Sequence, residues 1–196
     1  MASLNHATAI LQLDKNCFTT SDIKVLLQIE KNRTLEDAVQ RLIKSKVLIS
    51  LERGKYLKGA ANVSDFEIAQ FLYSPSYISF ETALNYHGIL SQFPMEITSA
   101  TTKRRIIKEI LGKVFSYGNI STKLFTGYYK EDKFLMALPE KALFDQLYMI
   151  ARGLKTEQYM DEMDYTRIKK QELNKYLPLV PDSFASGIKD LMSQYI

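Results

Sequence analysis

The sequence predicts an α+β protein in which an N-terminal winged helix-turn-helix is followed by a mixed α/β domain with a small sheet and a helical tail. Three observations support this prediction. The stretch from Arg33 to Leu57 joins an amphipathic helix pattern to a hairpin pattern. Residues 1–60 carry 10 lysines and arginines against 6 aspartates and glutamates, whereas residues 61–196 carry 16 of each. The rest of the chain mixes helical and strand-like segments.

The helix of the Arg33–Leu57 stretch is predicted from its apolar spacing. Thr34 is expected to act as the N-cap, with Asp37 three residues later in the capping-box position. The row of Glu36, Gln40 and Lys44, spaced by four, should then point outward. The apolar residues that follow the three-and-four spacing of one buried face are Leu35, Val39, Leu42 and Ile43.

A β-hairpin is predicted directly after this helix. Val47 to Leu51 is a short β-prone run, residues 52–55 (Glu-Arg-Gly-Lys) form a turn, and Tyr56-Leu57 begins the return strand. A helix with a polar face and a hairpin with a basic tip are typical of a winged helix-turn-helix, so this domain is expected to bind DNA. The candidate DNA-binding residues in it are Arg33, Thr34, Gln40, Arg41, Lys44, Arg53 and Lys55.

Among these candidates, Gln40 and Arg41 have the geometry for bidentate base contacts, while the lysines suit phosphates. Glu36 and Asp37 make the first turn of the helix acidic, which favours the helix dipole but repels phosphate. Two interpretations stay open. Either these carboxylates accept hydrogen bonds from cytosine N4 groups, or the chain binds DNA weakly.

The remainder of the first domain is expected to hold two further helices. Residues 2–13 show helical spacing, residues 16–20 read as a turn, and Thr20 or Ser21 can cap a second helix that reaches about residue 30. Residues 31–33 then turn the chain into the Arg33–Leu57 stretch. The small residues after Lys58 predict a boundary between domains 1–60 and 61–196.

The second domain is predicted to combine helices with a small central sheet. Ser79 is expected to cap a helix that ends before Gly88 in a left-handed C-cap position, and Pro139 to open a longer helix that stops near Gly153. Residues 106–112 are ambiguous between helix and strand. The strand candidates are residues 76–78, 95–100, 113–120, 124–129 and 134–137, and the other helices are expected over residues 64–74, 168–176 and 183–195.

A second basic run consists of Lys103, Arg104, Arg105 and Lys108. It is interpreted as an extension of the DNA-contacting surface, so Lys103, Arg104 and Arg105 join the DNA-binding candidates; an acidic partner or a solvated loop are the alternatives. His87 is expected to be a packed or capping histidine, because no cysteine pairs with it as a metal ligand.

No catalytic, metal-binding or cofactor-binding arrangement is predicted, so the chain is not expected to be an enzyme. Glu140 and Asp145 are five residues apart, and an internal ion pair or a helix-start charge explains them better than catalysis. No window resembles a membrane span, and no export signal opens the sequence. A single cysteine, Cys17, fits a reducing compartment, so a cytoplasmic location is expected.

Three phrases of the second domain carry a family resemblance. The first is SYISFETAL at residues 76–84, with His87-Gly88 after it. The second is ITSAT at residues 97–101. The third is ALPEKALFD at residues 137–145. In this order, after the predicted N-terminal winged helix that ends in Arg53-Gly54-Lys55-Tyr56, they resemble the AbiEi family of abortive-infection antitoxins over roughly residues 5–150.

This resemblance implies the antitoxin of a type IV toxin–antitoxin pair that acts in phage defence. In such proteins the N-terminal domain binds operator DNA and represses its own promoter. The C-terminal domain counteracts a nucleotidyltransferase-like toxin without needing a stable complex with it. The expected partners are therefore double-stranded DNA and a nucleotidyltransferase-like toxin. No cofactor is expected. A protein-partner-binding module and an orphan regulator without toxin neutralisation remain the alternatives.

Overall fold

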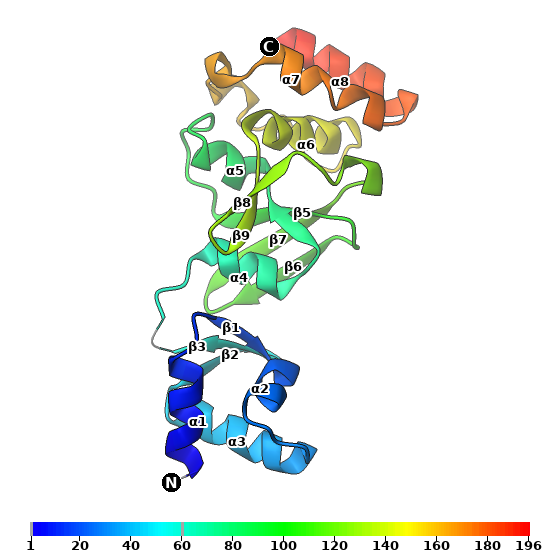
Figure 1. Cartoon of the computed structure of the whole chain (residues 1–196). Coiled ribbons are helices and arrows are strands. Elements are labelled where there is room, and N and C mark those ends of the chain that lie inside the picture. The colour runs from blue at the N-terminus through cyan, green and yellow to red at the C-terminus, as the bar shows by residue number, and fades with distance from the viewer. Residues whose placement is uncertain (1, 60) are drawn as a thin grey trace. The chain divides into compact units, whose positions relative to one another are not determined.

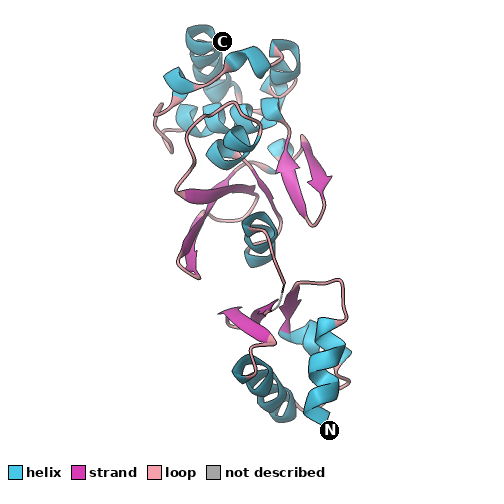
Figure 2. Cartoon of the chain, turned by 90° about the vertical axis from the view of Figure 1, so that its left-hand side faces the viewer, coloured by secondary structure: helices cyan, strands magenta, loops and turns pink. Residues whose placement is uncertain are grey.

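The chain divides into two units, Met1–Ser64 and Asp65–Ile196. The computed structural model describes residues 2–59 and 61–196, with side chains described from residue 6 onward. Both units contain helices and sheets, so the predicted α+β class is confirmed (Figures 1 and 2). The side chains of residues 2–5, which belong to the expected first helix, and the expected boundary residue Ala60 lie outside this description.

The first unit builds one apolar core between three helices and a three-stranded antiparallel sheet of order β1-β3-β2. The core includes Ile10, Phe18, Ile23, Val39 and Leu48, all buried. The elements are α1 (Ala2–Leu11), β1 (Cys17–Thr19), α2 (Thr20–Leu26), α3 (Asn32–Lys44), β2 (Leu48–Glu52) and β3 (Lys55–Lys58).

The expected turn at residues 16–20 is wrong, because residues 17–19 form strand β1, which pairs with β3. Three residues are too short a run to show the alternation that identifies a strand. Cys17 lies in this strand opposite Leu57, and its side chain is buried. Among the described residues, no helix is long and apolar enough to cross a membrane.

The cap of α2 also differs from the expectation. Thr19, rather than Thr20 or Ser21, is the N-cap: its Oγ accepts from the Asp22 backbone N–H at 3.1 Å, and its own N–H donates to the Asp22 carboxylate at 2.7 Å. Lys15 pairs with the same carboxylate at 2.8 Å. Burial opposes ionisation of Asp22, but the hydrogen bonds from Lys15 and Thr19 outweigh it and hold the pKa below its ordinary value.

Replacing Thr19 by alanine is expected to lower the free energy of unfolding of the first unit by about 1 kcal/mol, because one N-cap bond is lost. Ser21→Ala is the matched control and should change it by less than about 0.5 kcal/mol, since Ser21 is exposed and makes no cap. Denaturant titrations of both variants measure the difference. Equal losses would contradict the assignment of the cap.

The stability that this cap contributes to the first unit should decrease in acid. Because the folded-state pKa of Asp22 is lowered, its contribution to stability is present above the unfolded value of about 3.9 and disappears as pH falls through the lowered pKa.

The second unit is organised around a six-stranded mixed sheet of order β6-β7-β5-β4-β9-β8. Its central strands β4 and β5 are antiparallel. The hairpins β6–β7 and β8–β9 flank them, with β7 parallel to β5 and β9 parallel to β4. The strands are β4 (Ser76–Ile78), β5 (Glu96–Thr101), β6 (Ile106–Ile110), β7 (Lys113–Asn119), β8 (Tyr128–Glu131) and β9 (Phe134–Ala137).

Helices cover both faces of this sheet (Figure 1). On β7, the Tyr117 hydroxyl donates to the Ala69 carbonyl of α4, while the next residue, Gly118, faces the Phe80 ring of α5 and Met149 of α6. Successive strand residues therefore contact opposite helical layers. The helices are α4 (Asp65–Leu72), α5 (Phe80–Tyr86), α6 (Pro139–Ala151), α7 (Lys170–Asn174) and α8 (Asp182–Tyr195), with 3₁₀ turns at Thr122–Leu124, Met160–Glu162, Tyr165–Arg167 and Leu177–Leu179.

Several local expectations need correction. The ambiguous segment after residue 105 is strand β6. The expected strand at residues 124–129 begins only at Tyr128, because a 3₁₀ turn precedes it. Ser79 occupies the N-cap of α5, but its hydroxyl donates to Asp145 instead of capping. Gly88 does have the left-handed conformation, with φ of +69°.

A fully buried ion pair connects α6 to β4. Lys141 and Asp145, one helical turn apart, are both 0% exposed and their charged ends are in contact. The other carboxylate oxygen of Asp145 accepts from the Tyr77 hydroxyl at 2.8 Å and from Ser79 at 2.7 Å. Burial lowers the pKa of Lys141 despite the attraction of Asp145, and burial together with Asp145 raises that of Tyr77 well above its ordinary value.

Candidate nucleic-acid interface

Helix α3 separates an apolar face from a polar one. Leu35, Ala38, Val39 and Leu42 are buried in the core of the first unit. A second stripe, at positions i, i+4, i+7 and i+11, consists of Arg33, Asp37, Gln40 and Lys44, and all four are exposed. The spacing of the apolar residues therefore fixes which polar residues reach solvent.

The five predicted residues of α3 are all exposed: Arg33, Thr34, Gln40, Arg41 and Lys44. Arg33, Gln40 and Lys44 lie on one stripe, and Arg41 lies beside it together with Thr34. Within residues 2–59 and 61–196, none of the three cations forms an ion pair. Their charges are available to an external anion.

Thr34 does not cap α3. The helix begins three residues earlier than expected, at Asn32, with Lys31 as the N-cap and no side-chain hydrogen bond at that position. The Lys24 ammonium donates to the Asn32 side chain at 3.3 Å, which connects the first turn of α3 to α2. The capping-box prediction fails because Thr34 and Asp37 are already inside the helix, where Asp37 is exposed.

The β2–β3 hairpin presents its two predicted cations differently. Arg53 lies in the turn and is exposed, whereas Lys55 is half-buried and pairs with Glu52 at 3.0 Å. Gly54 adopts φ of +78°, which the tight turn requires, and its carbonyl accepts from the Thr20 backbone N–H at 3.0 Å. The hairpin tip is thus held to the start of α2, and Arg53 forms no ion pair with any side chain that the structure describes.

The second basic run lies between β5 and β6 of the other unit. Lys103 donates to the Ser74 carbonyl and lies over the Tyr73 ring at 5.4 Å, so it is tied to its own unit. The Arg104 side chain is exposed, and its carbonyl accepts from the Tyr73 hydroxyl at 3.1 Å. Arg105 is exposed and directly precedes β6. The three cations therefore do not form one uniform patch.

The acidic and histidine candidates have local partners. His87 Nε2 lies 2.7 Å from the Ala137 carbonyl, as expected of a packed histidine. The Asp145 carboxylate pairs with Lys141 inside the domain, and Glu140 accepts from the Lys169 backbone N–H at 3.1 Å. The part of the chain that the structure describes contains no group of three acidic, histidine or cysteine residues that could hold a metal ion.

A solved structure shares this fold. The chain is similar to the crystal structure of the RV2827C protein from Mycobacterium tuberculosis, with a TM-score of 0.65 and 16% sequence identity, over 98% of this chain and 76% of that chain. At this level of identity the likeness establishes the fold alone. No family model and no curated protein matches the sequence.

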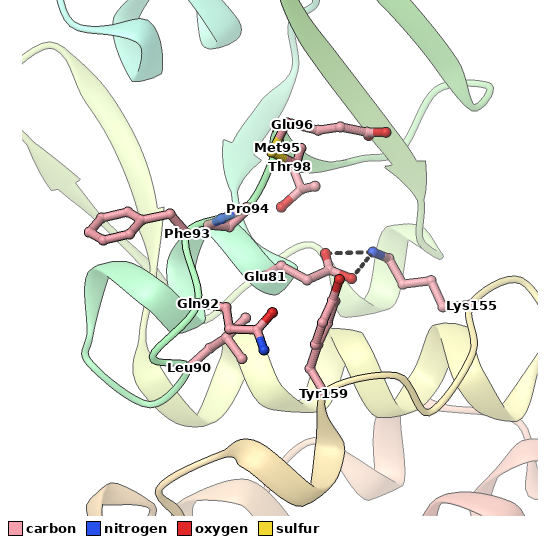
Figure 3. Close-up of a pocket in the computed structure, with 10 residues that line it drawn as sticks. All are labelled: Glu81, Leu90, Gln92, Phe93, Pro94, Met95, Glu96, Thr98, Lys155 and Tyr159. Atoms are coloured by element: carbon pink, nitrogen blue, oxygen red, sulfur yellow. Dashed lines mark hydrogen bonds and ion pairs between the residues drawn. The ribbon is translucent and has the colours of Figure 1, made fainter.

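A pocket of about 230 Å³ opens in the second unit beside α5 (Figure 3). Glu81 and Lys155 point toward each other in it and form an ion pair, and the Glu81 carboxylate also accepts from Gln146 at 3.1 Å. Tyr159 lies beside this pair, in a left-handed conformation with φ of +71°. The other residues that line the pocket are Leu90, Gln92, Phe93, Pro94, Met95, Glu96 and Thr98.

The lining of this pocket combines apolar and charged side chains. Glu81 and Glu96 give two carboxylates against the single ammonium of Lys155. Phe93 and Met95 next to it are 86% and 94% exposed. Sequence reasoning missed the pocket because Glu81 and Lys155 are 74 residues apart and only the fold brings them together.

Proposed function

We propose that the chain is a DNA-binding repressor whose first unit acts as a winged helix-turn-helix. In this proposal α3 enters the major groove and the β2–β3 hairpin is the wing that contacts the phosphate backbone. The observation that supports it is the exposed stripe of α3 on which Arg33, Gln40 and Lys44 lie without an ionic partner among the described residues. A buried opposite face holds that stripe in a fixed orientation.

The side chains of this stripe have distinct roles in the proposal. Gln40 suits a bidentate contact to adenine and the neighbouring Arg41 a bidentate contact to guanine, whereas Lys44 and Arg53 suit phosphates. Asp37 interrupts the stripe between Arg33 and Gln40. It repels phosphate but can accept a hydrogen bond from cytosine N4, so it favours a specific sequence over random duplex.

The resemblance to AbiEi antitoxins supports a second part of the proposal, that the chain counteracts a nucleotidyltransferase-like toxin. The most specific phrase of that resemblance, at residues 137–145, includes Lys141 and Asp145, whose buried pair connects α6 to β4. Residues 137–145 therefore have a structural role in this fold. The toxin-directed surface is assigned to the second unit.

The experiment that tests DNA binding compares affinities of the full chain for its own promoter fragment and for a random duplex at moderate salt. The Arg41→Ala/Lys44→Ala variant should bind the promoter at least tenfold more weakly and should show a smaller dependence of affinity on salt, because it loses a base contact and a phosphate contact.

The matched control is Lys169→Ala/Lys170→Ala, which removes the same charge from exposed positions of the second unit and should leave affinity within about twofold. Fluorescence anisotropy measures all three proteins. Equal affinity of the wild type for promoter and random duplex would contradict the repressor proposal.

A protein-partner-binding module is the second candidate function, and the exposed Phe93 and Met95 beside the pocket favour it. It predicts that the Arg41→Ala/Lys44→Ala variant neutralises the toxin as well as the wild type does. Co-expression with the gene adjacent to the chain's own reading frame measures this. Loss of neutralisation in that variant would argue against a role confined to the second unit.

A further inference from the structure

Strand β6 (Ile106–Ile110) forms one edge of the six-stranded sheet. It pairs with β7 on one side, and on its other side no strand lies within the part of the chain that the structure describes. An edge strand exposes a row of backbone N–H and C=O groups that can pair with another chain. The outward backbone groups and the side chains along β6 determine which chain can pair with this edge.

The turn of the β6–β7 hairpin decides which backbone groups point outward. Leu111 and Gly112 are the two turn residues, with φ of +53° and +73°, so Ile110 and Lys113 are the closing hydrogen-bonded pair. Hydrogen-bonded and non-hydrogen-bonded pairs alternate along an antiparallel ladder. The backbone N–H and C=O groups of Ile107 and Glu109, and by continuation those of Arg105, therefore face away from β7.

The same three residues share one face of the sheet, because side chains alternate along a strand. Arg105, Ile107 and Glu109 are all exposed, with Ile107 at 54%. Neither Arg105 nor Glu109 forms an ion pair with the residues that the structure describes. The edge thus presents a cation, an aliphatic side chain and an anion at equal spacing.

We infer that β6 pairs with β6 of a second copy of this chain, antiparallel and about a two-fold axis at Ile107. In that register Ile107 lies opposite its own counterpart, and Arg105 of each copy lies opposite Glu109 of the other. The outward backbone groups of the three residues then complete the ladder. The pattern is self-complementary, as the symmetric interface of a two-fold dimer requires.

Other two-fold registers of the same edge lack this charge complementarity. An axis at Lys108 places Lys108 opposite its own counterpart, and an axis at Glu109 does the same with two carboxylates. An axis at Ile106 places Lys108 opposite Arg104. Like charges directly opposite each other destabilise a cross-strand pair, whereas opposite charges stabilise it. Only the Ile107 register gains from both of its charged pairs.

The other edge of the sheet does not offer such a pattern. In the β8–β9 hairpin, Glu131 and Phe134 are the closing pair, so Tyr128 and Lys130 of β8 face outward. Two-fold pairing within β8 places Lys130 opposite Tyr128 or opposite another Lys130. Because no carboxylate shares that side of the strand, β6 is the edge suited to self-association.

Sedimentation velocity over a range of protein concentrations tests the inference on the full chain. The wild type should show reversible dimerisation. Glu109→Arg should weaken it at least tenfold, about 1.4 kcal/mol, because both charged pairs become repulsive. Arg105→Glu/Glu109→Arg should restore wild-type association, because exchanging the two charges keeps them complementary across the axis.

Asp190→Arg is the control for the change of charge, since Asp190 is exposed on α8, and it should leave dimerisation unchanged. Amide hydrogen exchange gives a second readout. The N–H groups of Ile107 and Glu109 should become more protected as the protein concentration rises, while that of Lys108 should not change. A monomer at every concentration, or a charge exchange that fails to restore the dimer, would overturn the inference. It does not depend on DNA binding, so it stands or falls separately from the proposed function.

Discussion

Asp145→Asn is expected to lower the free energy of unfolding of the second unit by about 3–5 kcal/mol. The substitution removes the counter-charge of a fully buried ammonium, so Lys141 must either stay charged without its partner or give up its proton in the folded state, and both cost stability. An asparagine is similar in size and still offers an oxygen to the Tyr77 and Ser79 hydroxyls, so the loss reports mainly the unpaired charge. Denaturant unfolding followed by near-UV circular dichroism measures it.

The lowered pKa of Lys141 predicts how this variant responds to pH. Burial already outweighs the attraction of Asp145, so without that carboxylate the folded state should favour neutral Lys141 more strongly. The folded state then binds fewer protons than the unfolded one. The stability of the Asp145→Asn variant should therefore rise with pH, up to the ordinary lysine value of about 10.4.

Two further variants separate the charge effect from lost packing. Lys141→Met/Asp145→Asn removes both charges and should recover most of the stability that Asp145→Asn loses. Lys175→Met breaks the exposed pair of Lys175 with Glu172 and should cost less than about 1 kcal/mol. If Asp145→Asn were as stable as Lys175→Met, the buried pair would not have the structural role assigned to it.

Gly59→Ala is expected to destabilise the first unit by about 2–3 kcal/mol. A Cβ atom at Gly59 would lie 2.0 Å from the carbonyl oxygen of Lys46, which is backbone and has little room to move. The Gly59 N–H also donates to the Val47 carbonyl at 2.9 Å, and the clash would break this bond. Hydrogen exchange of the β2 and β3 amides should show faster opening of the hairpin.

Gly187→Ala is the control, and its expected effect on stability has the opposite sign. A Cβ at Gly187 would meet its nearest atom, on Ala151, at 3.6 Å, which is an ordinary contact. Because Gly187 lies inside helix α8, alanine should stabilise that helix by about 0.5–1 kcal/mol. A Gly59→Ala variant as stable as the wild type would mean that the end of β3 can move away from Lys46 at little cost.

Much of the fold could be predicted because local patterns were strong. The apolar spacing of α3 and the Pro139 start of α6 identified these helices, and alternation of apolar and polar residues over residues 95–100 identified β5. The three-residue strand β1 and the three-residue difference at the start of α3 could not be predicted. Strand β1 is stabilised by pairing with β3, which is distant in the sequence. Asn32 belongs to the first turn of α3, where its side chain accepts a hydrogen bond from Lys24 of α2.

The candidate site shows the same division. The exposure of Gln40, Arg41 and Lys44 follows from helical periodicity alone, so the sequence could place them on a surface. The pairing of Lys55 with Glu52 and the tethering of Lys103 to Ser74 depend on the hairpin and on a contact across 29 residues. For this reason the sequence could not show that these two predicted DNA contacts already have partners inside the protein.

The burial of Cys17 provides a selective chemical probe of one half of the molecule. Of the 12 tyrosines only Tyr56 precedes residue 65, and the chain has no tryptophan, so absorbance and fluorescence follow mainly the second unit. The single thiol lies in strand β1, closed off from solvent by the sheet and core of the first unit. A thiol-specific reagent should therefore modify it only when that unit opens, and the labelling rate would measure this opening independently of the aromatic signals.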